Sequence, residues 1–159
     1  MATYFRTKAR FSEATDEGIV KLVTREFLIE AESWTEAEAR TYKLLETIVK
    51  GDFQIKKVND STIENVIIDD EDQDLFWLVK VKYPSIDDNG KEKYFTTQIV
   101  VTAKDILNAI QITGEALGNH SVADFEVISA TLTKISEFYS YEQDSEEIQD
   151  LDEEIDLPL

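Results

Sequence analysis

The sequence predicts an α+β fold built from two similar ββαβ units and followed by a disordered acidic tail. Residues 4–67 align with residues 76–139 without a gap, and both halves show the same order of strand-like and helical patterns. The composition then changes to an almost base-free, acidic segment. A small sheet with one helix buries too little surface alone, so we expect the units to pack about a pseudo-twofold axis. An OB-like barrel with an inserted helix, made by both units together, is the alternative.

The alignment of the two halves indicates an internal duplication. At an offset of 72 residues, 12 of the 64 aligned positions are identical. The identities fall on turn glycines, on a helix and on strand starts, as where Gly18 meets Gly90 and Lys8 meets Lys80. Identities at such positions favour a shared structure, because these positions set where turns and elements begin.

Each half begins with a predicted hairpin. The segments 3–11 and 75–83 are rich in aromatic and β-branched residues, and the return segments 20–31 and 93–103 have the same character. Between them lie TDEG in the first half and DDNG in the second, where Asn-Gly is a strong signal for a two-residue turn.

A helix and a further strand follow each hairpin. The first helix starts at SWTEAEAR, where Ser33 and Glu36 form a capping box, and runs to about Lys50. In the second half Asp105 replaces the serine. The apolar stripes predicted to face the core are Trp34, Ala37, Leu44, Leu45 and Ile48, then Ile106, Ala109, Ile110 and Leu117, and we expect Trp77 in the core as well. The segments 52–58 and 124–132 read as strands, with room for one more short strand at 62–68 and at 134–141.

These patterns divide the chain into four segments. Residues 1–68 form the first repeat, 69–74 (DDEDQD) an acidic connector, 75–140 the second repeat, and 141–159 the disordered tail. The formal net charge is −18, and the nine acids of residues 141–159, which include no base, account for half of it. The remaining acidity argues against a uniformly basic surface, so any nucleic-acid site must be local.

Several functional classes have little support in the sequence. There is no cysteine and a single histidine, His120, in a predicted loop, so the commonest ligands of transition metals are missing. No phosphate-binding, dinucleotide-binding or nucleophile-elbow motif is present. No run approaches the ~20 apolar residues of a membrane span, and MATYFRTKARF lacks the apolar region of a signal peptide. We therefore expect a cytosolic protein that is not an enzyme, with no metal site and no cofactor.

Basic side chains on the predicted hairpins suggest a nucleic-acid platform. Arg6, Lys8 and Arg10 alternate, so they share one face of the first strand. Cations that follow phosphates beside rings that stack bases are typical of sites for single strands. The alternative is that strand lysines protect sheet edges and form cross-strand ion pairs. The candidate residues are Arg6, Lys8, Arg10, Lys21, Arg25, Lys80, Lys82, Lys91 and Lys93 for phosphate, and Tyr4 and Phe76 for stacking.

The last ten residues, DLDEEIDLPL, resemble the tail tip of bacterial single-stranded DNA-binding proteins. In that family, acids and aliphatic residues precede a proline and a hydrophobic terminal residue, and the tip docks replication and repair enzymes. A terminal leucine in place of phenylalanine departs from that pattern. The resemblance implies a partner-binding role for Asp152, Glu153, Glu154, Ile155, Asp156, Leu157, Pro158 and Leu159.

The body resembles a different family. TKARF, the helix start SWTEAEAR and GDFQIKKV are similar to an uncharacterised family from Bacteroidetes and their phages, catalogued as a domain of unknown function. The resemblance covers residues 4–140 and implies a phage-encoded or mobile-element protein of the bacterial cytoplasm.

Together these observations predict a single-stranded DNA-binding protein of phage or bacterial replication or recombination, whose tail recruits replication or repair proteins. Two alternatives stay open: an acidic inhibitor that mimics DNA toward a host nuclease or polymerase, and a structural or packaged virion protein. Binding of RNA in place of DNA and assembly into a homo-oligomer also stay open.

Overall fold

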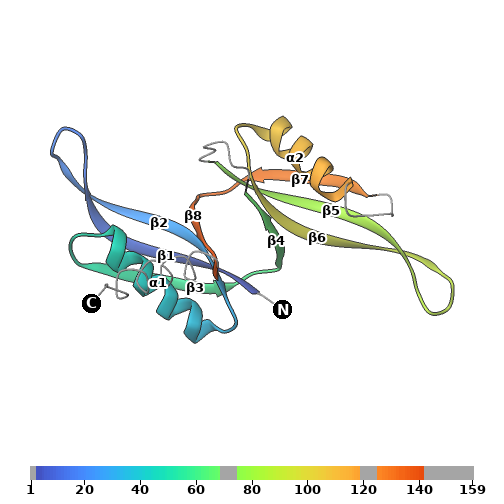
Figure 1. Cartoon of the computed structure of the whole chain (residues 1–159), viewed down its shortest axis with the longest axis horizontal. Helices are drawn as coiled ribbons and strands as arrows, with labels where there is room; N and C mark the ends of the chain where they lie inside the picture. The colour runs from blue at the N-terminus through green and yellow to red at the C-terminus, as the bar shows by residue number, and fades with distance from the viewer. Residues whose placement is uncertain (1–2, 69–74, 119–124, 142–159) are drawn as a thin grey trace, which may run out of the picture. The chain divides into compact units, whose positions relative to one another are not determined.

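The structure is a computed structural model that describes residues 3–68, 75–118 and 125–141, and these residues have an α+β architecture (Figure 1). The His120 loop, the acidic connector and residues 142–159 lie outside the described residues. The elements are, in chain order, β1 (Thr3–Ala14), β2 (Val20–Ala31), α1 (Trp34–Ile48), β3 (Phe53–Asp60), β4 (Ile63–Ile67), β5 (Phe76–Ile86), β6 (Glu92–Thr102), α2 (Ile106–Gly118), β7 (Glu126–Leu132) and β8 (Ile135–Tyr139).

The strands form two separate four-stranded sheets and not one barrel. The order is β3-β1-β2-β8 in the first sheet and β4-β6-β5-β7 in the second. β4 follows β3 in the chain but pairs in parallel with β6, and β8 follows β7 but lies beside β2. The compact units are therefore residues 3–61 with 137–141 (unit 1) and residues 62–136 (unit 2), which do not coincide with the contiguous repeats expected from the sequence.

The two long hairpins follow the predicted alternation. β1 pairs with β2 from Thr3–Ala31 to Ala14–Val20, and β5 pairs with β6 in the same antiparallel way. The turn of the second hairpin is a five-residue loop between Ile86 and Glu92, where the sequence predicted a two-residue Asn-Gly turn. Its Gly90 has φ +79°, a conformation that glycine adopts without steric cost.

Both helices begin with reciprocal capping, which the sequence predicts in full for α1 and only through Asp105 for α2. The Ser33 Oγ accepts a hydrogen bond from the Glu36 N–H at 3.1 Å, and the Glu36 carboxylate accepts one from the Glu32 N–H. At α2, the Asp105 carboxylate accepts a hydrogen bond from the Asn108 N–H at 2.7 Å, and the Asn108 side-chain oxygen accepts one from the Lys104 N–H at 3.1 Å. Side chains thus satisfy backbone donors that a helix start leaves free.

Each helix covers one face of its sheet. In unit 1 the core consists of odd-numbered β1 residues, their β2 neighbours, α1 residues and Tyr139. In unit 2 it consists mainly of Val79, Val81, Ile99, Val101 and Ala109. We call the face of each sheet that the helix does not cover the outer face. Because successive strand residues point to opposite faces, the even-numbered residues of β1 and β5 belong to the outer face.

The predicted apolar stripes are only partly correct. Ala37, Leu44, Leu45 and Ala109 are buried as expected. Trp34 is 52% exposed, and its indole N–H donates to the Val58 carbonyl at 2.9 Å, so this ring lies on the surface of unit 1 and not in its core. The remaining stripe residues divide between half-buried and exposed: Trp77 and Leu117 are half-buried, and Ile48, Ile106 and Ile110 are exposed.

Candidate nucleic-acid interface

The outer face of unit 1 gathers cations from two strands. Lys8 and Arg10 are exposed on β1 and have the same parity as Arg6. On the other side of β1, Lys57 of β3 lies directly opposite Lys8. Lys57 was not predicted from the sequence, because a β-bulge beside Lys8 shifts the register of β3 and no pattern within β3 itself signals the shift.

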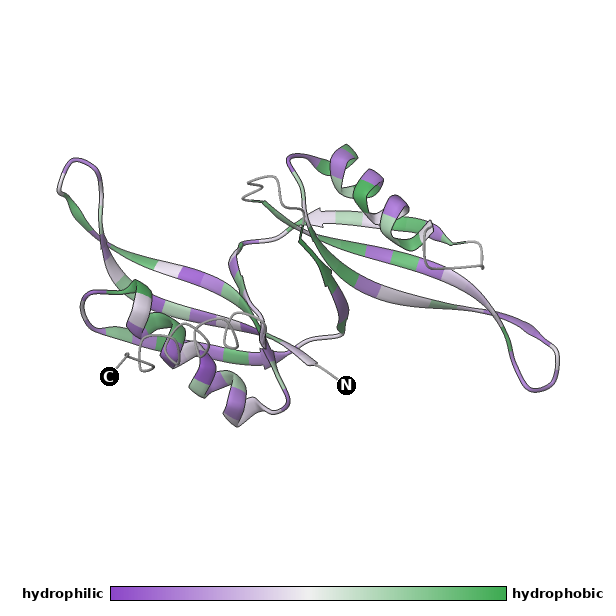
Figure 2. Ribbon diagram, in the orientation of Figure 1, coloured by the Kyte–Doolittle hydropathy of each residue, from purple (hydrophilic) through white to green (hydrophobic). Residues whose placement is uncertain are grey.

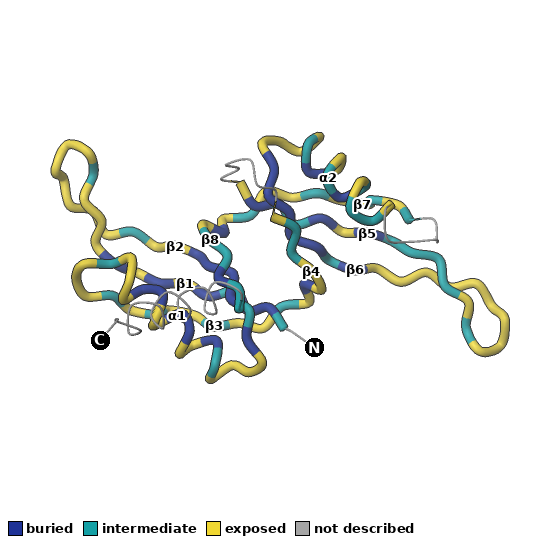
Figure 3. Tube along the Cα trace, in the orientation of Figure 1, coloured by how far each residue is buried: buried dark blue, intermediate teal, exposed yellow. Residues whose placement is uncertain are grey.

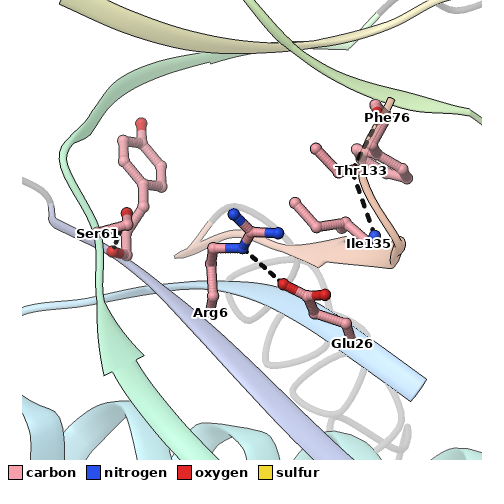
Figure 4. Close-up of polar contacts among 7 residues, drawn as sticks. Arg6, Glu26, Ser61, Phe76, Thr133 and Ile135 are labelled. Carbon is pink, nitrogen blue, oxygen red and sulfur yellow. Dashed lines mark hydrogen bonds and ion pairs between the residues drawn. The ribbon is translucent and has the colours of Figure 1, made fainter. Parts of the chain in front are cut away.

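Arg6 makes a structural ion pair. Its Nε lies 2.6 Å from the Glu26 carboxylate, and Glu26 is buried (Figure 4). Moving this guanidinium away from Glu26 would leave a buried carboxylate without its partner, which is costly, so the ion pair holds Arg6 in place. By contrast, the structure shows no ion pair at Lys8, Arg10 or Lys57 among its described residues. These three cations are the accessible ones on this outer face.

Four of the predicted phosphate ligands lie elsewhere. Lys21 and Arg25 are on the helix-side face of β2, and Arg25 pairs with Glu13 at 2.7 Å. Lys93 has the corresponding place on β6, with its Nζ 3.6 Å from Asp87, and Lys91 is in the hairpin loop. The structure therefore does not bring these four together with the outer-face cations of their sheets.

The outer face of unit 2 combines cations with an exposed ring. Lys80 and Lys82 are on β5, and Tyr94 lies opposite Pro84 on β6. The Lys82 Nζ is 4.3 Å from the centroid of the Tyr94 ring, which is a cation–π contact. Tyr94 is 59% exposed, so its ring remains accessible. Tyr94 was not among the predicted stacking residues, because the rings predicted to stack lie on the first strand of each hairpin.

The two rings predicted to stack bases are not accessible. Tyr4 is 8% exposed and Phe76 is 7% exposed. Burial, with Glu30 nearby, raises the pKa of Tyr4. Ser61 and Thr133 donate hydroxyl hydrogen bonds to the backbone carbonyls of Tyr4 and Phe76, at 2.6 Å and 2.8 Å (Figure 4). We therefore assign both rings to the structure and not to a stacking surface.

A shallow groove lies at the hairpin end of each outer face. The groove of unit 1 has a volume of about 450 Å³ and that of unit 2 about 350 Å³. At the offset of 72, five lining positions coincide: Arg10 with Lys82, Ser12 with Pro84, Leu22 with Tyr94, Phe53 with Phe125, and Gln54 with Glu126. Each groove thus joins one cation to an apolar wall, and Figure 3 shows both hairpin ends largely exposed.

The last described residues are fastened to α1 in unit 1. The Arg40 guanidinium lies 4.7 Å from the ring centroid of Tyr139 and 4.5 Å from that of Tyr141, and it donates to the Ser140 carbonyl. The Tyr141 hydroxyl donates to Glu36 at 2.7 Å. Burial and this hydrogen bond raise the pKa of Tyr141. Tyr141, the last described residue, is therefore held beside α1.

The described residues contain no cluster of three His, Asp or Glu side chains that could hold a metal ion, and none of their helices is long and apolar enough to cross a membrane. The fold and its sites thus define an α+β protein with two four-stranded sheets and, on each, a shallow groove whose lining includes one cation. The family model for a domain of unknown function, DUF4494, matches residues 3–141, so the chain belongs to that family. No curated protein matches it.

Proposed function

We propose that the protein binds single-stranded DNA along the outer faces of its two sheets. The observation that carries this proposal is the recurrence of one groove, with a cation and an apolar wall, at corresponding places on both sheets. Cations beside apolar or aromatic surface suit a strand whose bases are unpaired and can stack.

The two units contribute different contacts in this proposal. Unit 1 offers three exposed cations, Lys8, Arg10 and Lys57, and its groove wall is aliphatic at Leu22. Unit 2 offers Tyr94, an exposed ring with the Lys82 ammonium over it, so it is the unit that stacks a base. Two acids, Glu92 and Glu126, line the groove of unit 2, whereas Asp52 is the one acid that lines the groove of unit 1, so we expect weaker phosphate binding in unit 2.

The proposal extends to the origin and to the acidic segment. We propose that the halves arose by duplication, since both have the order of two strands, one helix and two strands. A phage or bacterial source, a place in the bacterial cytoplasm and recruitment of replication or repair proteins by residues 152–159 belong to the same proposal, and they rest on the sequence resemblances.

A second candidate is an acidic inhibitor that imitates DNA. The exposed ends of the two hairpins favour it, because Asp16 and Glu17 in one and Asp87 and Asp88 in the other add acids to a chain of net charge −18. Such an inhibitor would bind a nuclease or polymerase and have no affinity for DNA. A packaged virion protein would instead co-purify with particles and would need no tail tip.

Fluorescence anisotropy of a labelled poly-dT oligonucleotide, titrated at several salt concentrations, tests the proposal. We expect binding whose log affinity falls linearly with log salt. Replacing Lys8, Arg10 and Lys57 by alanine should weaken binding at least about tenfold and reduce the salt slope by about 2 to 3. The matched control replaces Lys21, Lys91 and Lys93, with the same change of charge, and should have a much smaller effect. Absence of binding at low salt would reject the proposal and favour the inhibitor.

A further inference from the structure

The outer side of α2 and the adjoining strand β7 carry exposed aliphatic side chains. Leu107 of α2 is 75% exposed, and Ile106 and Ile110 of the same helix are exposed as well. Ile128 and Leu132 are exposed on β7, the edge strand against which α2 packs. Figure 2 shows most of β7 coloured white to green. We call these five residues the α2–β7 surface.

The fold does not require aliphatic residues at these places, as unit 1 demonstrates. Its helix α1 and its edge strand β3 occupy the same positions in the order of elements. At the offset of 72, four of the five counterparts are polar and exposed: Thr35 for Leu107, Glu38 for Ile110, Lys56 for Ile128 and Asp60 for Leu132. The fifth, Trp34 for Ile106, is an exposed aromatic residue whose indole N–H donates to the Val58 carbonyl. The same architecture thus carries mostly hydrophilic residues in unit 1 where unit 2 carries aliphatic ones.

The two edge strands differ in the same way. Both contain a β-bulge, at Lys56 in β3 and at Ile128 in β7. β3 carries adjacent lysines, Lys56 and Lys57, which discourage another strand from pairing with this edge. From Val127 to Leu132, β7 has no charged residue. Its far edge, which no described strand covers, presents backbone donors and acceptors without such protection.

We propose that the α2–β7 surface is the interface of a symmetric dimer with a second copy of this chain. A twofold axis beside β7 pairs the strand antiparallel with its copy, mainly through residues 129–132 after the bulge. It also places α2 beside α2 of the second copy, because both helices then lie on the same side of the joined sheet. An edge strand and an apolar helix are each complementary to themselves under this symmetry, as an isologous interface requires.

Charge favours this occupant. Two chains of net charge −18 repel each other wherever their acids meet. α2 has one charged residue, Glu115, and β7 has one, Glu126. The surface is therefore among the least charged in the described chain, and it has few acids with which to select a basic partner. Contact between copies at this place buries aliphatic side chains at little electrostatic cost.

Sedimentation velocity of the full chain over a concentration series tests the dimer. The first variant gives β7 the residues of β3, Ile128→Lys with Leu132→Asp, and leaves the net charge unchanged. The second gives α2 the residues of α1, Leu107→Thr with Ile110→Glu. The matched control, Val20→Lys with Leu22→Asp, makes the first change at two exposed aliphatic residues of the β1–β2 hairpin.

We expect the wild-type chain and the control to dimerise, and both interface variants to raise the dimer dissociation constant by at least about 30-fold. All variants should stay folded, because the substituted side chains are exposed, and circular dichroism checks this. Hydrogen exchange should show residues 129–132 protected in the wild-type dimer and less protected in the variants. A wild-type chain that stays monomeric at every concentration overturns the proposal. So does a dimer that the control weakens as much as the interface variants.

Discussion

Arg40 shows how one side chain holds the last three described residues, 139–141, in place. Its guanidinium contacts the rings of Tyr139 and Tyr141 and donates to the carbonyl between them. The Tyr141 N–H donates to Glu30 and its hydroxyl to Glu36, so strand β2 and helix α1 both hold the residue. No motif in the sequence pointed to this cluster, because its members lie far apart in the chain and each resembles an ordinary surface residue.

Tyr141 should therefore contribute measurably to the stability of unit 1. Tyr141→Phe removes the hydroxyl that donates to Glu36 and should lower the free energy of unfolding by about 1 kcal/mol. Tyr141→Ala also removes the ring beside Arg40 and should lower it by about 2 kcal/mol. Urea denaturation followed by circular dichroism measures both values. Equal stability of the alanine variant and the wild type would show that the cluster does not stabilise the fold.

Tyr94 is the residue whose loss should affect base contact most directly. Stacking of one base on an aromatic ring contributes about 1–3 kcal/mol, so Tyr94→Ala should weaken poly-dT binding by about 5- to 150-fold. Tyr94→Phe keeps the ring and should bind nearly as well as the wild type. The matched control is Tyr42→Ala, at an exposed tyrosine of α1 that lines neither groove, and it should bind as the wild type does. Affinity that Tyr94→Ala leaves unchanged would exclude this ring from the binding site.

Glu137 gives the fold a pH dependence of known sign. Burial raises the pKa of this carboxyl above its ordinary value of 4.5. The folded state then binds the proton more tightly than the unfolded state, so this group lowers stability as pH rises from about 4.5 through the raised pKa. Glu137→Gln does not titrate, so its stability relative to the wild type should increase over that window. Urea denaturation at several pH values measures the difference, and a constant difference across the window would contradict it.

At the scale of elements, the sequence predicts most where the cause is local. The hairpins follow from alternation, and the helix starts follow from Ser33 and Asp105. The exposure of the apolar residues of α2 could not be predicted from the sequence. An apolar stripe with a 3.6-residue period looks the same whether it faces the core or an interaction surface. The prediction that Trp34 lies in the core was wrong for a similar reason. Its position fits the apolar stripe of the helix, but its indole N–H donates to the Val58 carbonyl of β3 at the surface.

Serine and aspartate should stabilise the two helix starts to a similar extent, so that either residue can replace the other at position 33 or 105. Ser33→Ala and Asp105→Ala each remove an acceptor from the first turn of a helix, which costs about 1 kcal/mol of unfolding free energy. Replacing each cap residue by the one found in the other unit, as in Ser33→Asp and Asp105→Ser, should retain most of the unfolding free energy. Thermal and urea denaturation of the four variants measures this. A stability loss from Ser33→Asp as large as that from Ser33→Ala would show that capping is not the cause.

For the whole molecule, the sequence identified nearly every strand but not where the strands pair. The segments 62–68 and 134–141 read as short strands, and β4 and β8 lie there. Because each short strand follows its own half in the chain, the sequence predicted that it would join the sheet of that half. In the structure β4 pairs with β6, and β8 lies beside β2. Apolar alternation within a five-residue strand tells which side chains face inward and says nothing about which sheet receives them.

This exchange of strands predicts that neither half of the chain folds alone. A chain of residues 1–68 lacks β8 and Tyr139, which belongs to the core of unit 1, and its β4 lacks the partner strand β6. It should therefore show little cooperative unfolding, and mixing it with residues 75–159 should restore a cooperative transition. As a control, the full chain cleaved within residues 69–74 should stay folded, because cleavage there removes no described strand. Denaturation curves of each fragment and of the mixture decide the matter: cooperative unfolding of residues 1–68 alone would mean that the hairpin, α1 and β3 suffice without the exchanged strands.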